Sequence, residues 1–305
     1  MRLLKFAAID IGTNAVRLLF SNVTENNKQA TFKKASLVRV PIRLGQDVFR
    51  KEGKIEEVRR EKLISTMHAF HHLINVHDVI DFRACATSAM REAENGQELV
   101  DIVMKRTGIN IEIIDGQTEA EIIYANRIVD MIDNTGSYLY VDVGGGSTEV
   151  TLFAKNEVIM SYSFNIGTIR ILKNQVRGLE YERMQSFLQK VRKDYPNVQI
   201  IGSGGNINKI FKLSGQKYMK PISYKKIREI YKMILPYSLD ERIKTLGLNP
   251  DRADVIIPAA QIFMKIMDWS DARYILVPKF GVADGIVRQL YYNYKKHTQE
   301  KVADL

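Results

Sequence analysis

Tyr138-Leu-Tyr-Val-Asp-Val-Gly-Gly-Gly-Ser-Thr-Glu-Val-Thr-Leu-Phe153 is the stretch that decides how this chain folds. Its apolar run from Tyr138 to Val141 is typical of a buried strand, and Asp142 stands where that strand ends. The glycines that follow carry no Cβ, so their backbone can approach a ligand closely, and consecutive N–H groups in such a turn form an anion site. Val150 to Phe153 then predicts a second strand. The stretch as a whole predicts a strand–loop–strand unit that binds phosphate.

Polar residues around these glycines indicate a cation beside the phosphate. Asp142 and Glu149 flank the turn, and two carboxylates there would repel a phosphate unless a cation lay between them. Hard divalent ions with oxygen ligands suit that position, Mg²⁺ above all. A tight hairpin without a ligand is the alternative, but the strand context favours a phosphate site. Its predicted phosphate-binding residues are Gly144, Gly145, Gly146 and Ser147.

The N-terminal residues repeat this arrangement. Leu3 to Ile9 predicts a strand that ends at Asp10, and a short glycine loop leads into a second strand from Arg17 to Val23. Asp10 and Asp142 occupy equivalent places in the two copies. We therefore expect two related domains whose loops meet across a cleft and hold one phosphate chain, with coincidence between two hairpins as the alternative.

Composition and charge narrow the class of protein. At 305 residues the chain is long enough for two domains, and its 45 basic and 35 acidic residues give a net charge of +10. That excess favours a polyanionic partner, although a basic surface that only aids solubility is the alternative. The single cysteine, Cys85, lies in an apolar run, which predicts a buried unreactive thiol in a reducing compartment. Without a signal peptide or an apolar run of about 18 residues, a cytoplasmic protein is expected.

Two further positions add candidate site residues in the first half of the chain. Thr87 and Ser88 favour the start of a short helix, and Arg91 within it can donate two hydrogen bonds to a phosphate. A capped helix with a solvated arginine is the alternative. A second helix follows Asp115 and carries Glu119 and Glu121 on different faces, so only one of these carboxylates can face a cleft. Such a carboxylate can orient and deprotonate water, whereas acidic bias at a helix start is the alternative.

In the second half, two segments predict contacts with anions. A third strand–glycine–helix junction, Gly202 to Asn206, makes Gly204 and Gly205 candidate phosphate ligands, with a simple packing turn as the alternative. Basic residues then accumulate, and helical spacing predicts an exposed face for a long polyanion. The residues of this predicted track are Lys225, Arg228 and Lys232.

Several ordered motifs together resemble the Ppx/GppA phosphatase family of exopolyphosphatases and guanosine-pentaphosphate phosphohydrolases. They are Asp10 to Arg17, Ala86 to Arg91, Asp115 to Ala120, Asp142 to Glu149, Gly202 to Asn206 and Arg252 to Asp254. The resemblance covers almost the whole chain, as a short form without the helical C-terminal extension of longer members. It implies an α/β fold of two ribonuclease-H-like domains of the actin, hexokinase and Hsp70 superfamily. The expected domains are 1–124 and 125–285, with an active cleft between them and a last helix, about 286–305, that packs on the first.

The same resemblance implies a role for each matching residue. Glu119 corresponds to the catalytic carboxylate that positions the attacking water, and Asp142 and Glu149 to residues that hold the metal or assist the base. Asp10, Asp142 and Glu149 are the expected metal ligands, for Mg²⁺ or, in its place, Mn²⁺. The expected phosphate contacts outside the central stretch are Gly12, Thr13, Asn14, Arg17, Arg91, Gly204 and Gly205.

The chain departs from the family pattern at three places. Ala15 removes one hydroxyl from the first loop, Thr118 replaces an acidic neighbour of Glu119, and Ala283 replaces an arginine near the C-terminus. The last of these changes bears on substrate contacts near Asp284.

The expected function is Mg²⁺-dependent release of the terminal phosphate of inorganic polyphosphate, by a homodimer without nucleic-acid or membrane partners. Removal of the 5′-terminal phosphate of guanosine pentaphosphate is the alternative within the family. An actin-like ATP-dependent kinase and a catalytically inactive binding protein are the alternatives outside it.

Overall fold

The computed structural model describes residues 3–26, 29–50, 52–126, 136–155 and 157–303. The chain divides into two units, one made of Met1–Asn126 with Phe280–Leu305 and the other of Arg127–Lys279. Residues 280–285, expected at the end of the second domain, lie in the first unit instead. There the Asn126 side chain donates to the Gly281 carbonyl at 3.1 Å, and Asp284 forms an ion pair with Lys34 at 2.8 Å.

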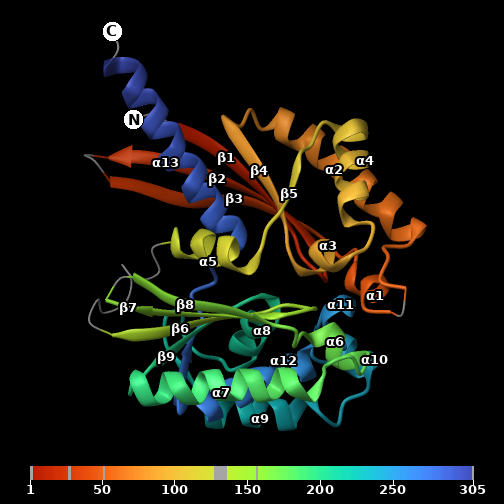
Figure 1. Ribbon diagram of the computed structural model, residues 1–305, viewed down its shortest axis with the longest axis vertical. Helices are drawn as coiled ribbons and strands as arrows, with labels where there is room; N and C mark the ends of the chain where they lie inside the picture. Colours follow the sequence, from red (N-terminus) through yellow and green to blue (C-terminus); the bar gives the residue numbers. More distant parts are fainter. Residues whose placement is uncertain (1–2, 27–28, 51, 127–135, 156, 304–305) are drawn as a thin grey trace. The chain divides into compact units, whose positions relative to one another are not determined.

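A five-stranded mixed sheet with the order β3-β2-β1-β4-β5 forms the N-terminal unit (Figure 1). β1 pairs antiparallel with β2 and parallel with β4. Every residue of β1 from Phe6 to Ile11 is buried, as expected for a strand that is covered on both faces. The strands are β1 (Leu3–Ile11), β2 (Val16–Asn26), β3 (Gln29–Val40), β4 (Asp81–Ala86) and β5 (Ile111–Ile113).

Helices cover this sheet and lead into its loops. α2 (Glu57–Val76) and α4 (Gly96–Thr107) pack against each other, and α13 (Val282–Ala303) packs across β1, β2 and β4. Rings join α13 to the sheet, since Phe6 lies edge-on to Tyr291 and Tyr294 with centroids 6.4 and 6.0 Å away. Three short helices complete the unit: α1 (Gly45–Val48), α3 (Ser88–Glu92) and α5 (Gly116–Tyr124).

Asp284 and Gly285, at the family departure near the C-terminus, have structural contacts in the first turn of α13. Asp284 accepts a hydrogen bond from the Gly281 N–H at 3.0 Å, in addition to its ion pair with Lys34. Burial raises the pKa of the Asp284 carboxyl, while Lys34 acts in the opposite direction. A Cβ at Gly285 would lie 1.9 Å from the Ile122 carbonyl oxygen, so α13 and α5 cross there with no room for a side chain.

The second unit repeats the strand arrangement of the first. Its sheet has the order β10-β11-β9-β6-β7-β8, in which β6 pairs antiparallel with β7 and parallel with β9. Apart from the added β10, the order matches the first sheet strand for strand. The expected α/β fold of two ribonuclease-H-like units is confirmed. The strands are β6 (Ser137–Val143), β7 (Thr148–Ala154), β8 (Glu157–Phe164), β9 (Gln199–Ser203), β10 (Ile222–Ser223) and β11 (Tyr274–Leu276).

The apolar helix α12 (Ile256–Ser270) lies at the centre of the second unit's helical layer (Figure 1). It packs against α6 (Thr168–Leu172), α7 (Gly178–Asp194), α8 (Gly205–Leu213) and α9 (Tyr224–Ile234). Two short helices, α10 (Leu239–Lys244) and α11 (Pro250–Ala253), precede it. In the described part of the chain, no helix combines the length and apolar character needed to cross a membrane.

Candidate active site

The N-terminal loop, residues 12–15, closes the hairpin of β1 and β2. Asp10 lies opposite Arg17 in the antiparallel register, and the Gly12 N–H donates to the Ala15 carbonyl at 3.1 Å. Arg17 donates from Nη1 to Asp10 Oδ2 at 2.6 Å, and the Asp10 side chain is 10% exposed. The loop therefore begins and ends on a hydrogen-bonded pair of opposite charges.

The segment after β3 binds the backbone of this loop. The Arg43 N–H donates to the Asn14 carbonyl and the Gly45 N–H to the Thr13 carbonyl, both at 3.1 Å. Thr13 is buried, whereas Gly12 and Asn14 are half-buried. Two loop carbonyls are thus fixed by backbone groups from the region around α1.

Arg91 stands between the ends of β4 and β5. The Thr87 N–H donates to the Ile11 carbonyl at 3.1 Å, which ties the start of α3 to the end of β1. Thr87 occupies the N-cap position, but its side chain makes no capping hydrogen bond, contrary to the cap expected from the sequence. Arg91, half-buried, donates from Nη1 to the Ile114 carbonyl at 2.8 Å, and this contact orients the guanidinium at the start of the loop before α5.

Glu119 lies in the first turn of α5. The Asp115 side chain caps this helix by accepting from the Thr118 N–H at 2.7 Å, and this hydrogen bond holds the pKa of Asp115 below its ordinary value. Glu119 is 4% exposed whereas Glu121 is exposed, so Glu119 is the buried one of these two carboxylates. The expected separation of the two carboxylates onto different faces is confirmed.

The buried Cys85 thiol lies beside Asp10 in the sheet, and nearby carboxylates affect its pKa. Burial raises the pKa of this thiol to about 12, and the charges of Glu112, Asp10 and Glu119 add to the increase. Cys85 pairs with Asp10 in the register of β1 and β4. The expected burial of the Cys85 thiol is confirmed, and its raised pKa disfavours the reactive thiolate.

The second loop, residues 144–147, has the same register but different charges. Asp142 lies opposite Glu149, and the Gly144 N–H donates to the Ser147 carbonyl at 3.0 Å. Glu149 is buried, and its Oε1 accepts from Ser147 Oγ at 2.5 Å and from Ser163 Oγ at 3.0 Å. Two carboxylates therefore face each other across this hairpin, and two hydroxyl groups fix one of them.

The start of α6 binds the glycines of the second loop. The Thr168 N–H donates to the Gly144 carbonyl at 3.0 Å, and the Ile169 N–H to the Gly145 carbonyl at 2.8 Å. Arg170 donates from Nε to the Gly146 carbonyl at 2.8 Å. All three glycine carbonyls are thus bound from the α6 side, which fixes the direction of the peptide groups in the predicted anion site.

The third glycine junction lies against Asp142. Gly204 has φ +101°, and a Cβ there would lie 2.9 Å from Asp142 Oδ1, so this position requires glycine. At Gly205 a Cβ would lie 2.9 Å from the Arg252 guanidinium. The structure therefore brings Asp142, Gly204, Gly205 and Arg252 together at the N-terminus of α8, where peptide dipoles favour an anion.

The predicted polyanion track lies on α9. Lys225, Arg228 and Lys232 are all exposed on this helix. Its opposite face is apolar and buried through Ile227, Ile230 and Ile234. The three basic residues belong to the same unit as the second glycine loop.

Asp142 and Glu149 fit a divalent cation better than Asp10 does. Among the described residues, no group of three or more His, Cys, Asp or Glu side chains forms a complete metal cage. Mg²⁺ commonly uses one or two carboxylates and takes its remaining ligands from water and phosphate, so the opposed Asp142 and Glu149 suit it. Asp10, by contrast, already shares its carboxylate with Arg17.

The sequence did not identify Ser163 or Arg252 as individual site residues. Ser163 meets Glu149 because it is the cross-strand partner of that residue in β8. A hydroxyl at alternating positions of β8, Ser161 and Ser163, was the available signal, but it becomes informative only once the register is known. Arg252 belonged to a recognised motif, but its approach to Gly205 joins residues that are far apart in the sequence.

Comparison with known proteins places the chain among phosphatases. Residues 23–293 match the model of the Ppx/GppA phosphatase family. The chain is 24% identical to exopolyphosphatase 2 of Mycobacterium tuberculosis, over 95% of this chain and 99% of that protein. It is 29% identical to the bifunctional 3-dehydroquinate synthase/phosphatase of Fusobacterium nucleatum subsp. nucleatum, over 89% of this chain but 44% of that longer protein.

A solved structure agrees with these sequence comparisons. The crystal structure of the Ppx/GppA family member from Aquifex aeolicus superposes with a TM-score of 0.75 at 25% identity, covering 96% of this chain and 99% of that one. The matched region takes in the second hairpin, Glu119 and α9, and extends into α13. The chain belongs to the Ppx/GppA phosphatase family, a family of phosphoanhydride hydrolases.

Proposed function

We propose that this protein is an exopolyphosphatase that releases the terminal phosphate of inorganic polyphosphate with the help of Mg²⁺. The observation that carries the proposal is the pair of hairpins with one register and different charges. One hairpin is closed by the Asp10–Arg17 ion pair, and the other opposes Asp142 to Glu149. One hairpin with an ion pair and one with two opposed carboxylates suit a substrate that is rich in negative charge and is bound together with a cation. Membership of the family agrees with such a substrate.

The N-terminal loop and Arg91 would bind phosphate oxygens. Thr13 and Asn14 would supply loop N–H groups, and their carbonyls are bound by the Gly45 and Arg43 N–H groups. The Gly12 N–H is used within the loop by the Ala15 carbonyl, and Gly12 would contribute by letting the backbone approach the phosphate without a Cβ. Arg91 supplies a guanidinium that the Ile114 carbonyl already orients. We assign Asp10 to orienting Arg17, because their ion pair at 2.6 Å uses the carboxylate.

Asp142 and Glu149 would hold the cation, with Gly144 to Ser147 binding phosphate beside it. Hydrogen bonds from Ser147 and Ser163 fix the Glu149 carboxylate before any ligand arrives. When bound, Mg²⁺ supplies positive charge that neutralises the phosphate oxygens. Mn²⁺ prefers the same oxygen ligands and would serve in its place.

Glu119 would act as the general base. Its carboxylate accepts a proton from water while the water oxygen bonds to the terminal phosphorus. The bond from that phosphorus to the bridging oxygen breaks, and the shortened chain leaves with the bridging oxygen and its electron pair. A buried position in the first turn of a capped helix gives Glu119 a fixed direction for this task.

Long polyphosphate is the proposed substrate because of the basic face of α9. Three exposed cations within one helix, Lys225, Arg228 and Lys232, suit a chain of repeating negative charges better than a single small ligand. The match to exopolyphosphatase 2 of Mycobacterium tuberculosis, over almost the whole length of that protein, supports polyphosphate as the class of substrate.

Phosphate release tests the proposal. Purified protein is incubated with long-chain polyphosphate, guanosine pentaphosphate or ATP, each with and without Mg²⁺, and free phosphate is measured over time. We expect the highest kcat/KM with polyphosphate and little release without a divalent cation. Faster release from guanosine pentaphosphate would redirect the substrate assignment, and absence of release from every phosphoanhydride would refute the hydrolase.

A further inference from the structure

We infer that Gly45 and Gly167 are positioning residues that fix the two phosphate loops through direct contact with them. The inference rests on the proposed function, because it concerns how the same two loops are held. Neither glycine lies in its phosphate loop: Gly45 begins α1, and Gly167 is the N-cap of α6. Each lies in the segment that follows the third strand of its sheet.

Gly45 contacts Thr13 in two ways. Its N–H donates to the Thr13 carbonyl at 3.1 Å, and a Cβ at this position would lie 2.3 Å from Thr13 Cγ2. The next neighbour of that Cβ would be the Phe49 ring, at 2.9 Å. Thr13 Cγ2 is the nearest of these atoms and belongs to the predicted phosphate loop, so a larger residue at position 45 would press on that loop first.

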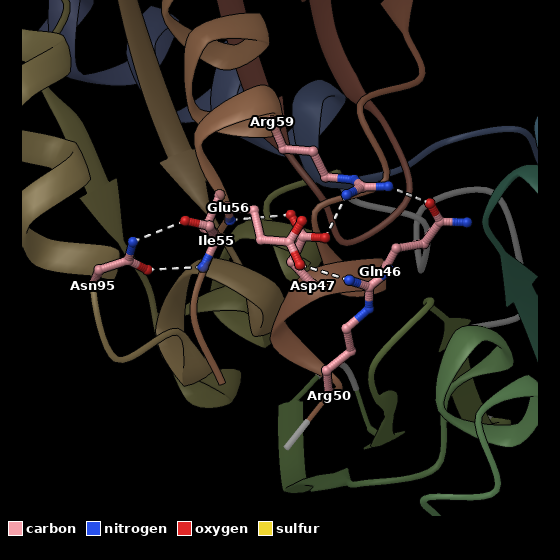
Figure 2. A network of polar contacts seen from close by, with 7 residues as sticks. All are labelled: Gln46, Asp47, Arg50, Ile55, Glu56, Arg59 and Asn95. Carbon is pink, nitrogen blue, oxygen red and sulfur yellow. Dashed lines mark hydrogen bonds and ion pairs between the residues drawn. The ribbon is translucent and has the colours of Figure 1, made fainter. Parts of the chain in front are cut away.

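An ion-pair network holds Gly45 in place (Figure 2). Asp47, which is 1% exposed, pairs with Arg59 of α2 and accepts from the Glu56 N–H at 3.1 Å. Arg59 binds Asp47 through Nη1 and donates from Nη2 to Gln46 Oε1 at 2.5 Å. Arg50 forms an ion pair with Glu56 at 2.6 Å. The segment that carries Gly45 is therefore fixed to α2, so it can resist movement of the loop.

Asn95 secures the far end of this network. Its side chain accepts from the Ile55 N–H at 2.9 Å and donates to the Ile55 carbonyl at 3.0 Å (Figure 2). Asp47 is a buried charge, so separating it from its partners would cost free energy of folding. This cost holds the four-residue helix α1 in one position, and α1 can therefore support the loop.

The second unit uses the same arrangement with a different contact. A Cβ at Gly167 would lie 2.3 Å from both the Gly145 carbonyl oxygen and the Gly146 carbonyl carbon. The residue has φ −132°, a conformation that alanine also adopts, so space alone requires glycine. A buried carboxylate again anchors the segment, since Glu180 accepts from the Asn165 N–H at 2.9 Å.

The two contacts differ in a way that permits a rescue experiment. Gly45 meets a side-chain methyl group, which the substitution Thr13→Ser removes while keeping the hydroxyl. Gly167 meets backbone atoms, so no single side-chain change can relieve the contact. A glycine that served only general packing would not couple to the identity of residue 13.

A double-mutant cycle tests the inference. Wild type, Gly45→Ala, Thr13→Ser and the double variant are compared in polyphosphate hydrolysis. Gly45→Ala is expected to lower kcat/KM by about 10–100-fold, mainly through KM, because displacing a binding loop by an ångström costs that much. The double variant should return to within about threefold of Thr13→Ser alone, since the coupled pair is in contact. Gly167→Ala is expected to cause a similar loss that Thr13→Ser does not relieve.

Amide hydrogen exchange provides a readout without substrate. Gly45→Ala should accelerate exchange of the amides in the 12–15 loop, and Thr13→Ser should reverse this. If wild type releases no phosphate, the proposed function fails while exchange still decides the positioning role. Equal kcat/KM for wild type and Gly45→Ala, or losses that simply add in the cycle, would overturn the inference.

Two further variants keep the test decisive. Gly178→Ala is the control, because a Cβ there would find no atom within 4 Å, and it should change neither readout. Arg59→Lys keeps the charge but loses the fork that contacts both Asp47 and Gln46. If Gly45→Ala does not fold, Arg59→Lys should still accelerate exchange in the 12–15 loop, and unchanged exchange would contradict the support by α1.

Discussion

The two glycine hairpins share one backbone arrangement and differ in the charges that close it. In both, an aspartate ends the first strand, a glycine N–H donates to the residue three positions on, and a charged residue faces the aspartate. The facing residue is Arg17 in the first hairpin and Glu149 in the second. The first hairpin therefore pairs opposite charges at this register position, whereas the second places two carboxylates opposite each other.

Under the proposed function, this difference would divide phosphate binding and cation binding between the two hairpins. A hairpin whose aspartate is neutralised by arginine leaves its loop N–H groups suited to phosphate. A hairpin with two opposed carboxylates needs a cation, and phosphate can follow the cation. Under the proposed function, one backbone arrangement would therefore serve two binding roles, and the residue that faces the aspartate, Arg17 or Glu149, would separate them.

The largest effect is expected at Glu119, which lies in a segment where the two units have different chain paths. Glu119 follows the fifth strand of the N-terminal sheet, whereas after the equivalent strand β11 the chain leaves its unit at Lys279. Glu119→Gln should lower kcat by roughly 10²–10⁴ with little change in KM, because it removes a base and keeps the size of the side chain. Steady-state phosphate release measures both constants. Glu121→Gln, on the exposed face of α5, is the control, and equal activity of all three proteins would exclude Glu119 from catalysis.

A smaller loss is expected when the second hairpin loses one carboxylate. Glu149→Gln should lower kcat by about 10²–10³, because it removes a carboxylate that would hold the cation. The cation in turn would stabilise the negative charge that develops on the phosphate oxygens. The substitution should also raise the Mg²⁺ concentration needed for half-maximal rate. Ser163→Ala, which removes only one hydrogen bond to Glu149, should shift the Mg²⁺ requirement less. A Mg²⁺ titration that is unchanged in Glu149→Gln would argue against a cation at this hairpin.

The basic face of α9 should affect binding rather than chemistry. Charge reversal of Lys225, Arg228 and Lys232 to Glu should raise KM for long polyphosphate, by more at 0.01 M than at 0.15 M salt because screening weakens exposed charges. KM values for chains of different length at the two ionic strengths measure this. Charge reversal of Lys190 and Lys193 on α7 provides a comparison with other exposed cations of the same unit. A loss confined to short chains would show that α9 is not the track.

The smallest effect concerns the cap of the helix that carries Glu119. Asp115→Ala should lower the free energy of unfolding by about 1 kcal/mol at pH 7. The Thr118 hydrogen bonds depress the pKa of Asp115, so the cap stabilises above the ordinary pKa near 3.8 and weakens as pH falls through the lower folded value. Urea unfolding at pH 7 and pH 3 measures the difference between the two proteins. A difference that grew as pH fell would contradict this account of the cap.

Local patterns in the sequence were sufficient to predict the hairpins and the face of α9. An apolar strand ending in aspartate and glycine is a short-range signal, and both copies appear with the expected equivalence of Asp10 and Asp142. The three-residue spacing of Ile227 and Ile230 likewise separates the buried face of α9 from its basic face. These features depend on neighbours within one or two turns or strands.

Other parts of the site depend on contacts between distant residues. Gly45 contacts Thr13 although the strands β2 and β3 separate them in the sequence, and a four-residue helix has no periodicity that would predict the contact. Ser163 becomes informative only through its register with Glu149. The boundary near residue 280 was placed too late because the contacts of Gly281 and Asp284 with Asn126 and Lys34 leave no signal in composition.

Binding of Mn²⁺, followed by electron paramagnetic resonance in the presence of a non-hydrolysable diphosphate, tests the division between the hairpins most directly. Asp142→Asn should weaken Mn²⁺ binding by at least about tenfold, whereas Asp10→Asn should leave it within about threefold of wild type. Circular dichroism verifies that both variants fold. Equal weakening by the two substitutions would show that both hairpins contribute to the cation site. Loss of binding in Asp10→Asn alone would assign the cation to the first hairpin, and either result would contradict the account.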